Sequence, residues 1–398
     1  MIPRTLQGRL AELAGSFPAV FLTGPRQSGK TTLARATFPD FAYVSLEELH
    51  NRQQADEDPL GFLSRLEGCK GAILDEVQKS PQLFSYLQGF LDEGRGGPLV
   101  LTGSQHFLLS DRISQSLAGR VAILELLPFS LAELAGREPI PPGGFPETPV
   151  GRFPGDGIGL DRVLLSGMYP PIHARRLDPV AWLEGYLATY VERDVRTLSN
   201  IGNLDTFTRF LRLCAGRAGQ LLNTSSLAAD AGVSNDTARR WLSVLRASYV
   251  VELLQPHHKN FNKRLVKSPK LYFLDCGLLC RLLGINDTEQ LAVHPLRGAV
   301  FENFVFTELV KIYRHHGQRP PLFFWRDRTG HEVDFLIDGG TRLVPVEVKA
   351  GRTVAGDFLR NLDFFCRLSG EPAGALVYGG DEAYTLRGHR VIPWWSCS

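Results

Sequence analysis

Cysteine is scarce in this chain and follows no recognisable pattern. Six cysteines are scattered through 398 residues, and the closest pair, Cys276 and Cys280, lies in an apolar CGLLC run. A disulfide framework is therefore excluded. Because no second Cys or His pair lies near Cys276 and Cys280, we expect buried thiols there rather than a metal site.

Long apolar runs and a strong charge of either sign are missing too. No run of 18 residues is apolar enough to span a membrane, and the opening MIPRTLQGRL lacks the apolar core of a secretion signal. We therefore expect a cytoplasmic protein with no membrane partner. The net charge of +2 identifies no partner by itself, because a nearly neutral chain can still carry local basic surfaces.

Proline and glycine, by contrast, gather in one place. Residues 136–160 read GREPIPPGGFPETPVGRFPGDGIGL, a composition that does not suit a regular helix or strand. This segment predicts a linker or a long loop. Hydrophobic residues make up 43% of the chain, enough for more than one core, and the length suggests two or three domains.

The most informative segment is VFLTGPRQSGKTT, residues 20–32. A short apolar strand precedes a loop with the pattern G-x-x-x-x-G-K-[ST] and a helix-like continuation. The backbone N–H groups of such a loop cradle phosphates, while Lys30 reaches the outer phosphates and the Thr31 hydroxyl ligates Mg²⁺. We therefore predict a nucleoside triphosphate site, whose residues are Gly24, Pro25, Arg26, Gln27, Ser28, Gly29, Lys30, Thr31 and Thr32.

An acidic pair ends a second apolar strand, in the segment GAILDEVQ. Asp75 is predicted to hold Mg²⁺, and Glu76 to orient or deprotonate the attacking water. A third strand, LVLT, is followed by Ser104 and Gln105. Either of these two side chains is a candidate for sensing the γ-phosphate and positioning the water.

This order of motifs resembles an AAA+ type ATPase. After the sensor strand come a helix-like segment, an arginine and a last strand, and the run SLAGR followed by VAILELLPFSLAEL resembles one prokaryotic family in particular. In that family an N-terminal AAA ATPase precedes a C-terminal domain of unknown function. The resemblance covers nearly the whole chain and implies ATP and Mg²⁺ as the ligands of the loop.

Arg120 follows the helix that precedes the last core strand. In AAA+ proteins this place commonly carries an arginine finger that reaches the nucleotide of a neighbouring subunit, so the resemblance implies a catalytic role for Arg120 in a homo-oligomer. The alternative is that Arg120 only caps the C-terminus of its own helix, where a cation is favourable.

Residues 224–254 have the plan of a winged helix-turn-helix. A helix that ends at a glycine is followed by a turn, by a second helix from Asn235 and by strand-like YVVELL. The second helix is expected to turn Trp241, Leu242 and Leu245 toward the core. The residues predicted to contact DNA phosphates are Arg239, Arg240, Lys259, Lys263 and Arg264. Winged helices also serve as protein-docking modules, and that alternative stays open.

The last third of the chain holds a helix glutamate, a strand aspartate and a Glu-x-Lys pair on the next apolar strand. Glu302 lies in a helix-like AVFENFVFTELVKIY, Asp334 in a strand-like HEVDFLID, and Glu347 and Lys349 in LVPVEVKA. This set resembles the core of the PD-(D/E)xK nuclease superfamily. The resemblance implies that Asp334 and Glu347 bind Mg²⁺, that Lys349 stabilises or activates the nucleophile and that Glu302 completes the metal shell. Such domains are also used for binding without cutting, and Glu347 and Lys349 could simply pair on an exposed face.

We therefore expect an α/β protein with a P-loop AAA+ type parallel-sheet ATPase domain, a helical middle region with a winged helix, and a restriction-nuclease-like α/β C-terminal domain. The predicted ranges are 1–135 for the ATPase core, 136–160 for the linker or loop, 161–285 for the middle region and 286–398 for the nuclease-like domain. The expected function is ATP hydrolysis on DNA by a homo-oligomer. The alternatives are an ATP-regulated metal-dependent nuclease and a nucleotide-switched module that docks proteins without DNA.

Overall fold

The computed structural model describes residues 2–104, 117–148, 150, 159–190, 204–257 and 266–398, and Gln105, Lys259, Lys263 and Arg264 lie outside these ranges. The chain divides into two compact units. Unit 1 contains residues 1–129 with the short segments 247–249 and 314–318, and unit 2 contains the remainder. Each unit has its own sheet, so each is described by itself.

Unit 1 contains a parallel five-stranded sheet in the order β2-β3-β4-β1-β5. Its strands are β1 (Ala19–Thr23), β2 (Ala42–Ser45), β3 (Ala72–Asp75), β4 (Leu99–Gly103) and β5 (Val121–Glu125). The α/β class and the parallel sheet predicted for the N-terminal domain are thus confirmed. Because all carboxyl ends of parallel strands meet at one edge, the segments that follow β1, β3 and β4 lie along the same edge of the sheet.

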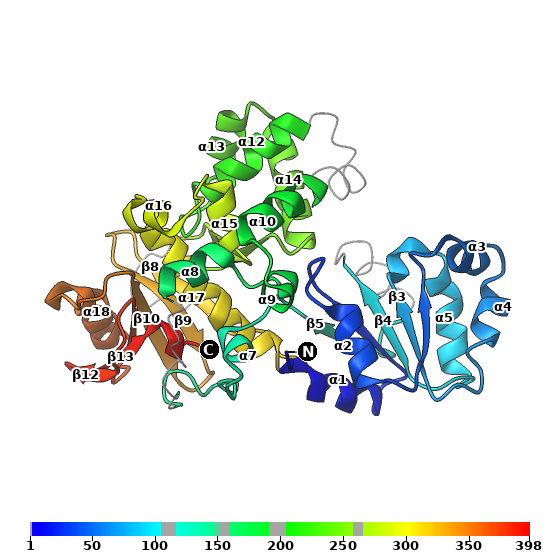
Figure 1. Ribbon diagram of the computed structural model, residues 1–398. Coiled ribbons are helices and arrows are strands. Elements are labelled where there is room, and N and C mark those ends of the chain that lie inside the picture. The colour runs from blue at the N-terminus through cyan, green and yellow to red at the C-terminus, as the bar shows by residue number, and fades with distance from the viewer. Residues whose placement is uncertain (1, 105–116, 149, 151–158, 191–203, 258–265) are drawn as a thin grey trace. The chain divides into compact units, whose positions relative to one another are not determined.

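Both faces of this sheet are covered by helices, as Figure 1 shows. Alternate residues of β1 point to opposite sides: Ala19 and Phe21 belong to one apolar cluster, and Val20 and Leu22 to another. The first cluster includes residues of α3 (Leu49–Glu57), α4 (Pro59–Ser64) and α5 (Leu83–Asp92), and the second residues of α1 (Leu6–Ala14) and α2 (Lys30–Thr37). Burial on both faces explains why the strands read as nearly continuous apolar runs.

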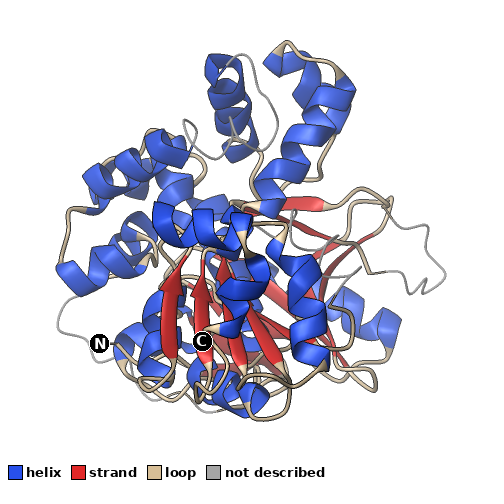
Figure 2. Ribbon diagram, turned by 90° about the vertical axis from the view of Figure 1, so that its right-hand side faces the viewer, coloured by secondary structure: helices blue, strands red, loops and turns tan. Residues whose placement is uncertain are grey.

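Unit 2 contains most of the helices and a second sheet. Figure 2 shows the helices and strands of the whole structure in separate colours. The helices that begin in this unit are α7 (Leu131–Ala135), α8 (Leu160–Ser166), α9 (Pro170–Arg175), α10 (Pro179–Thr189), α12 (Leu204–Ala215), α13 (Thr224–Ala231), α14 (Asn235–Ala247), α15 (Cys276–Leu282), α16 (Thr288–Val293), α17 (Arg297–Arg314) and α18 (Arg360–Ser369). Short 3₁₀ helices also occur, η1 (Val77–Lys79) in unit 1, and η3 (Gly356–Leu359) and η4 (Trp394–Ser396) in unit 2.

The sheet of unit 2 has six strands in the order β12-β13-β11-β10-β9-β8. They are β8 (Leu322–Arg326), β9 (Glu332–Asp338), β10 (Leu343–Lys349), β11 (Ala375–Tyr378), β12 (Tyr384–Leu386) and β13 (His389–Pro393). β8, β9 and β10 form an antiparallel meander, and β11 pairs parallel to β10. The chain therefore runs through one helix (α17), three strands, a second helix (α18) and a parallel strand.

The middle of the chain adds a helix pair and a small hairpin to unit 2. α13 ends at Ala231 and is followed by Gly232, which has a φ of +73°; α14 begins three residues after this glycine. The hairpin pairs β6 (Val251–Leu254) with β7 (Lys270–Phe273) in antiparallel register. Trp241 of α14 packs edge-on against Phe207 and Phe210 of α12, with ring centroids 5.2 Å apart in both pairs.

Several local expectations can be compared directly with this fold. Trp241, Leu242 and Leu245 are buried, and so are Cys276 and Cys280, as predicted. Within the proline- and glycine-rich segment 136–160, residues 136–148 form no helix or strand, and α8 begins at its last residue, Leu160. Within the described ranges no helix is both long enough and apolar enough to cross a membrane.

One buried side chain joins β7 to α17. Asn303 of α17 is fully buried; its Oδ1 accepts from the backbone N–H of Phe273 at 2.7 Å, and its Nδ2 donates to the carbonyl of Phe273 at 2.9 Å. The amide thus takes the place of a neighbouring strand along β7. Both backbone groups need a partner, because neither is accessible to water.

Replacing this amide by an apolar group of similar size should destabilise unit 2. Asn303→Leu leaves a buried N–H and a buried C=O without partners, at a cost of about 2–4 kcal/mol. Asn286→Leu, at an exposed position, is the matched control and should change stability by less than about 0.5 kcal/mol. Urea unfolding followed by circular dichroism measures both, and equal midpoints for the two variants would contradict the role given to Asn303.

Candidate functional site

The glycine-framed loop lies at the carboxyl edge of the five-stranded sheet, between β1 and α2. Gly24 has a φ of +147°, and a Cβ there would overlap with the carbonyl oxygen of Leu126. Gly29 has a φ of +93° and immediately precedes the first turn of α2. These two positions therefore require glycine, and together they direct the loop around the N-terminus of α2.

Arg4 supports this loop from the N-terminal segment. Its Nη1 donates to the carbonyl of Ser28 at 2.8 Å, and its Nη2 to the carbonyl of Leu127 at 2.6 Å. The guanidinium also lies 4.7 Å from the ring centroid of Phe129. No motif in the sequence marks Arg4, because its partners lie 24 and 123 residues away.

Lys30 is the buried cation of the loop. Its Nζ donates to the carbonyl oxygens of Gly24 at 3.0 Å and Pro25 at 2.8 Å. Burial lowers the pKa of Lys30 to about 8, although the carboxylates of Glu76 and Asp75 act in the opposite direction. An anion with oxygen atoms at the loop would therefore offer this ammonium stronger partners than two neutral carbonyls.

The other loop residues differ in exposure. Gln27 and Thr32 are exposed, Arg26 is half-buried and Pro25 is buried. Ser28 is fully buried, and its hydroxyl has no partner among the described residues. A buried hydroxyl of this kind suits a loop that closes around a polar ligand.

The carboxylate of Asp75 is the meeting point of three hydroxyl groups. The Thr31 hydroxyl lies 2.8 Å from Asp75 Oδ1 and 3.0 Å from Asp75 Oδ2 and donates to this carboxylate. The Tyr43 hydroxyl donates to Asp75 Oδ2 at 3.0 Å. Thr102 donates to its Oδ1. Asp75 is nearly buried, so its charge is balanced by these donors and by Lys30 nearby.

Thr31 and Asp75 therefore fit Mg²⁺. Mg²⁺ prefers oxygen ligands and is usually held by one or two carboxylates with substrate phosphates. The hydroxyl of Thr31 and the carboxylate of Asp75 provide such oxygens within hydrogen-bond distance of each other. Tyr43 and Thr102, which complete this arrangement, were not predicted, because they lie 32 and 27 residues from Asp75 in the sequence.

Glu76 and Ser104 are linked by a third side chain. Glu76 adopts a left-handed conformation with a φ of +58°, and its backbone N–H donates to Thr102 Oγ1 at 3.3 Å. Gln78 Nε2 donates both to the Glu76 carboxylate and to Ser104 Oγ, the latter at 3.3 Å. The acidic pair, Asp75 and Glu76, and the sensor position, Ser104, thus lie together at one edge of the sheet. Gln78 was not predicted, because no motif in the sequence includes it.

Arg120 lies at the opposite edge of the sheet. It directly precedes β5, and its carbonyl accepts from the N–H of Ala19 at the start of β1. The length of a five-residue strand, about 16 Å, separates it from the loop. Arg120 therefore cannot reach the loop of its own chain.

The side chain of Arg120 is instead paired with Asp92 at the end of α5. Its Nε and Nη2 donate to the two carboxylate oxygens at 2.5 and 2.8 Å. This fork raises the pKa of Arg120 and lowers the pKa of Asp92. The guanidinium remains partly open to solvent, with 30% of its side chain exposed.

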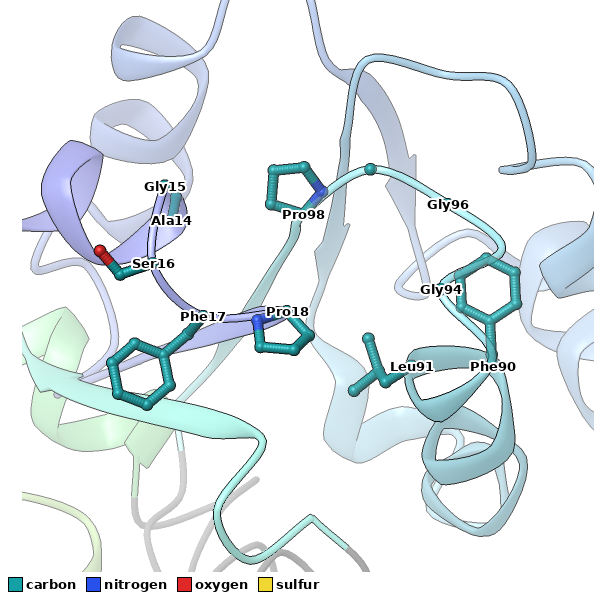
Figure 3. A pocket seen from close by; sticks show the side chains of 11 residues that line it. Ala14, Gly15, Ser16, Phe17, Pro18, Phe90, Leu91, Gly94, Gly96 and Pro98 are labelled. Atoms are coloured by element: carbon teal, nitrogen blue, oxygen red, sulfur yellow. The ribbon is translucent and has the colours of Figure 1, made fainter.

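A cavity of about 360 Å³ lies at this same edge of unit 1. Figure 3 shows that its lining includes Phe17 and Pro18 before β1, Leu91 of α5 and Pro98 before β4. It is thus far from the phosphate loop, which follows β1 at the other edge.

A second group of titratable side chains lies in unit 2. Lys349 Nζ donates to Glu347 Oε1 at 2.7 Å, and the other oxygen of Glu347 is buried without a partner among the described residues. The pKa of Glu347 is raised to about 8, mainly because the carboxyl group is buried and secondly because the negative charge of Asp334 is nearby. Asp334 itself accepts from the backbone N–H of Val348 at 2.9 Å.

Glu302, the fourth predicted member, is bound mainly by two residues that were not predicted. Lys270 Nζ lies 3.3 Å from its carboxylate, and the Tyr272 hydroxyl donates to it. Burial raises the pKa of Glu302 to about 7. One feature of the sequence could have identified Lys270: it is a lysine at the start of an otherwise apolar strand, β7. Within the described residues no three His, Cys, Asp or Glu side chains are arranged so that they could hold a metal ion.

The described residues proposed for DNA contact lie on α14. Arg239 and Arg240 are exposed there, and Arg239 is 4.0 Å from Asp236 one turn earlier. Lys259, Lys263 and Arg264 lie outside the described residues.

Three family models match consecutive parts of the chain. An AAA domain matches residues 16–135, a domain of unknown function (DUF8612) matches residues 158–289, and a domain of unknown function (DUF4143) matches residues 297–397.

Solved structures give weaker likenesses. The Walker-type ATPase PABY2304 of Pyrococcus abyssi has a TM-score of 0.46 and 15% identity over 71% of this chain and 96% of that chain. A single-substitution variant of RuvB from Thermotoga maritima has a TM-score of 0.32 and 18% identity, over 62% of this chain and 86% of that chain.

The chain also resembles curated proteins over most of its length. It is 33% identical over 389 residues to the uncharacterized protein Rv2008c of Mycobacterium tuberculosis, an alignment that covers 96% of this chain and 81% of that protein. The same values hold for Mb2031c of Mycobacterium bovis, and MJ1544 of Methanocaldococcus jannaschii is 23% identical over 79% of this chain and 71% of its own length. The chain therefore belongs to the family of Rv2008c and Mb2031c, with an AAA-type P-loop ATPase domain followed by a C-terminal DUF4143 domain.

Proposed function

We propose that this protein hydrolyses ATP at the carboxyl edge of the five-stranded sheet and does so as a homo-oligomer acting on DNA. The observation that carries the ATPase part is the convergence of Lys30, Thr31 and Asp75, with Glu76 beside them. An AAA domain matched over the same residues supports it.

Each residue of this group has a distinct part in the proposed reaction. Lys30 exchanges its two carbonyl partners for oxygens of the β- and γ-phosphates. Thr31 and Asp75 would hold Mg²⁺, and the ion would supply positive charge against the phosphates. Glu76, oriented by Gln78, orients the attacking water or accepts its proton, and Ser104 lies where it can position the same water.

The oligomer is proposed from the place of Arg120. Its guanidinium lies at the edge remote from its own loop and is partly exposed, so an arginine finger here would have to serve a neighbouring subunit. The alternative is that the fork with Asp92 only ties β5 to α5.

The DNA partner is proposed from the middle region. α13, a glycine turn, α14 and the β6–β7 hairpin follow one another as in a winged helix-turn-helix, and Arg239 and Arg240 are exposed on the second helix. A docking surface for another protein is the alternative, because the fold alone does not define the partner.

For the C-terminal domain we propose a restriction-nuclease-like fold. The order of α17, β8 to β10, α18 and β11, with β11 parallel to β10, supports this. Metal-dependent cutting of DNA is the second candidate function, and the buried unpartnered oxygen of Glu347 close to Asp334 favours it. The contact of Glu302 with Lys270 argues against it.

The ATPase proposal predicts opposite behaviour for two single substitutions. Lys30→Ala removes the phosphate-binding cation and should reduce both ATP affinity and turnover, turnover by at least about 100-fold. Glu76→Gln should still bind ATP but hydrolyse it slowly. Lys70→Ala, which removes an exposed lysine, is the control. Calorimetric ATP titration and phosphate release measure the pair, and full turnover by Lys30→Ala would refute the proposed site.

The oligomer proposal predicts rescue between inactive variants. An arginine finger contributes about 10³–10⁵ to the rate, so Arg120→Ala and Glu76→Gln should each be nearly inactive alone. Mixed subunits should recover activity, because some interfaces combine an intact Arg120 with an intact Glu76. Asp92→Asn keeps the guanidinium and should stay active. If Asp92→Asn were as inactive as Arg120→Ala and no mixture of variants recovered ATPase activity, the Arg120–Asp92 pair would only stabilise the fold of its own chain.

The DNA proposal predicts a change in salt dependence. Each phosphate contact adds about 0.9 to the slope of log affinity against log salt for duplex DNA, so Arg239→Gln with Arg240→Gln should lower the slope by about 1.8. ATP affinity should not change. Arg246→Gln, on the same helix but close to Glu252, serves as the control. A slope unchanged by the double substitution would favour a protein-docking role for this helix.

A further inference from the structure

The carboxylate cluster of unit 2 contains a lysine from outside the six-stranded sheet. Lys270 belongs to β7, and only 2% of its side chain is exposed. Its Nζ lies 2.5 Å from Glu332 Oε1 and 3.3 Å from Glu302 Oε1. The ammonium therefore bridges a carboxylate of α17 and a carboxylate of β9.

The two carboxylates bound by Lys270 have further partners. The Tyr272 hydroxyl donates to the same oxygen of Glu302, and Arg326 Nη1 lies 3.0 Å from Glu332 Oε2. Lys270 also lies 5.6 Å from the ring centroid of Phe324. Both carboxylates are thus directed toward fixed cations and hydroxyls of the protein.

The charge of Lys270 is strongly stabilised in this place. Burial alone would lower its pKa, but the carboxylates of Glu302, Asp334 and Glu332 outweigh burial and raise it. A buried ion pair is costly to break, because removal of one partner leaves an uncompensated charge away from water. A divalent cation at the same carboxylates would have to lie next to this ammonium, which disfavours it.

We propose that Lys270 is the resident cation of this cluster: its single positive charge lies between the carboxylates of Glu302 and Glu332, where it excludes a divalent metal. The cluster then holds no Mg²⁺ or Mn²⁺. Its role is to bind β7, in the segment matched by DUF8612, to α17 and β9 of the DUF4143 segment. Glu302 is then engaged by Lys270 and cannot complete a metal shell with Asp334 and Glu347, so the proposal argues against metal-dependent cutting of nucleic acid, the second candidate function.

This proposal predicts that removal of the lysine creates a metal site. Mn²⁺ binding is measured by electron paramagnetic resonance on the full chain, without nucleotide and in an Asp75→Asn background that disables the other candidate metal site. The protein with Lys270 should bind no Mn²⁺ in unit 2. Lys270→Met should gain one Mn²⁺ per chain, and a further Glu332→Gln substitution should remove it, because Glu332 is one of the two carboxylates that Lys270 bridges. Lys267→Met, at an exposed lysine close by, should gain none.

Two results would overturn the proposal. The first is Mn²⁺ binding by the chain that retains Lys270 and its loss on Asp334→Asn, which would identify a metal site. The second is a folded Lys270→Met chain that binds no more Mn²⁺ than its parent. If Lys270→Met does not fold, the proposal is tested on the parent chain and on Lys270→Arg. The melting temperature of each should be the same in EDTA and in Mn²⁺, and a higher value in Mn²⁺ would overturn the proposal. ATP turnover is not measured, so the outcome is independent of the proposed ATPase.

Discussion

The arrangement of the ATPase unit depends on one buried carboxylate. Asp75 needs hydrogen-bond donors because its charge has been removed from water. Three hydroxyls supply them, from Thr31 on α2, Tyr43 on β2 and Thr102 on β4. These contacts connect the helix after the phosphate loop to three adjacent strands, so the loop, the acidic pair and the sensor position share one edge. A shift of one strand by one residue would separate them.

In unit 2, too, buried polar side chains are paired with partners on other elements. Asn303 replaces a neighbouring strand for Phe273, and Lys270 balances two carboxylates. The Asn303 link joins β7 to α17, and the Lys270 link joins β7 to α17 and to β9 of the C-terminal sheet. Buried polar groups that are fully paired restrict how elements can pack, since any other packing leaves one of them unpaired. The middle and C-terminal segments therefore form one compact unit although separate family models match them.

Local patterns in the sequence were sufficient for the phosphate loop, the parallel sheet and the burial of Trp241, because each depends on neighbouring residues or on strand and helix periodicity. Arg4, Tyr43 and Lys270 could not be predicted in this way. Their partners lie 24 to 123 residues away, and their positions follow only from how strands and helices are ordered in space. The roles of Arg120 and of the DNA-contacting arginines stay predictions, because they concern partners outside the chain.

The central claim is that the carboxylate of Asp75 and the loop around Lys30 form a working Mg²⁺-dependent ATPase site. Phosphate release by Asp75→Asn tests it most directly, since the amide can still bond hydroxyls and keep the fold, as circular dichroism would verify, but is a poor Mg²⁺ ligand. Because metal ions contribute several kcal/mol to such reactions, the rate should fall at least about 100-fold. A folded Asp75→Asn chain that releases phosphate at the unaltered rate would contradict the claim.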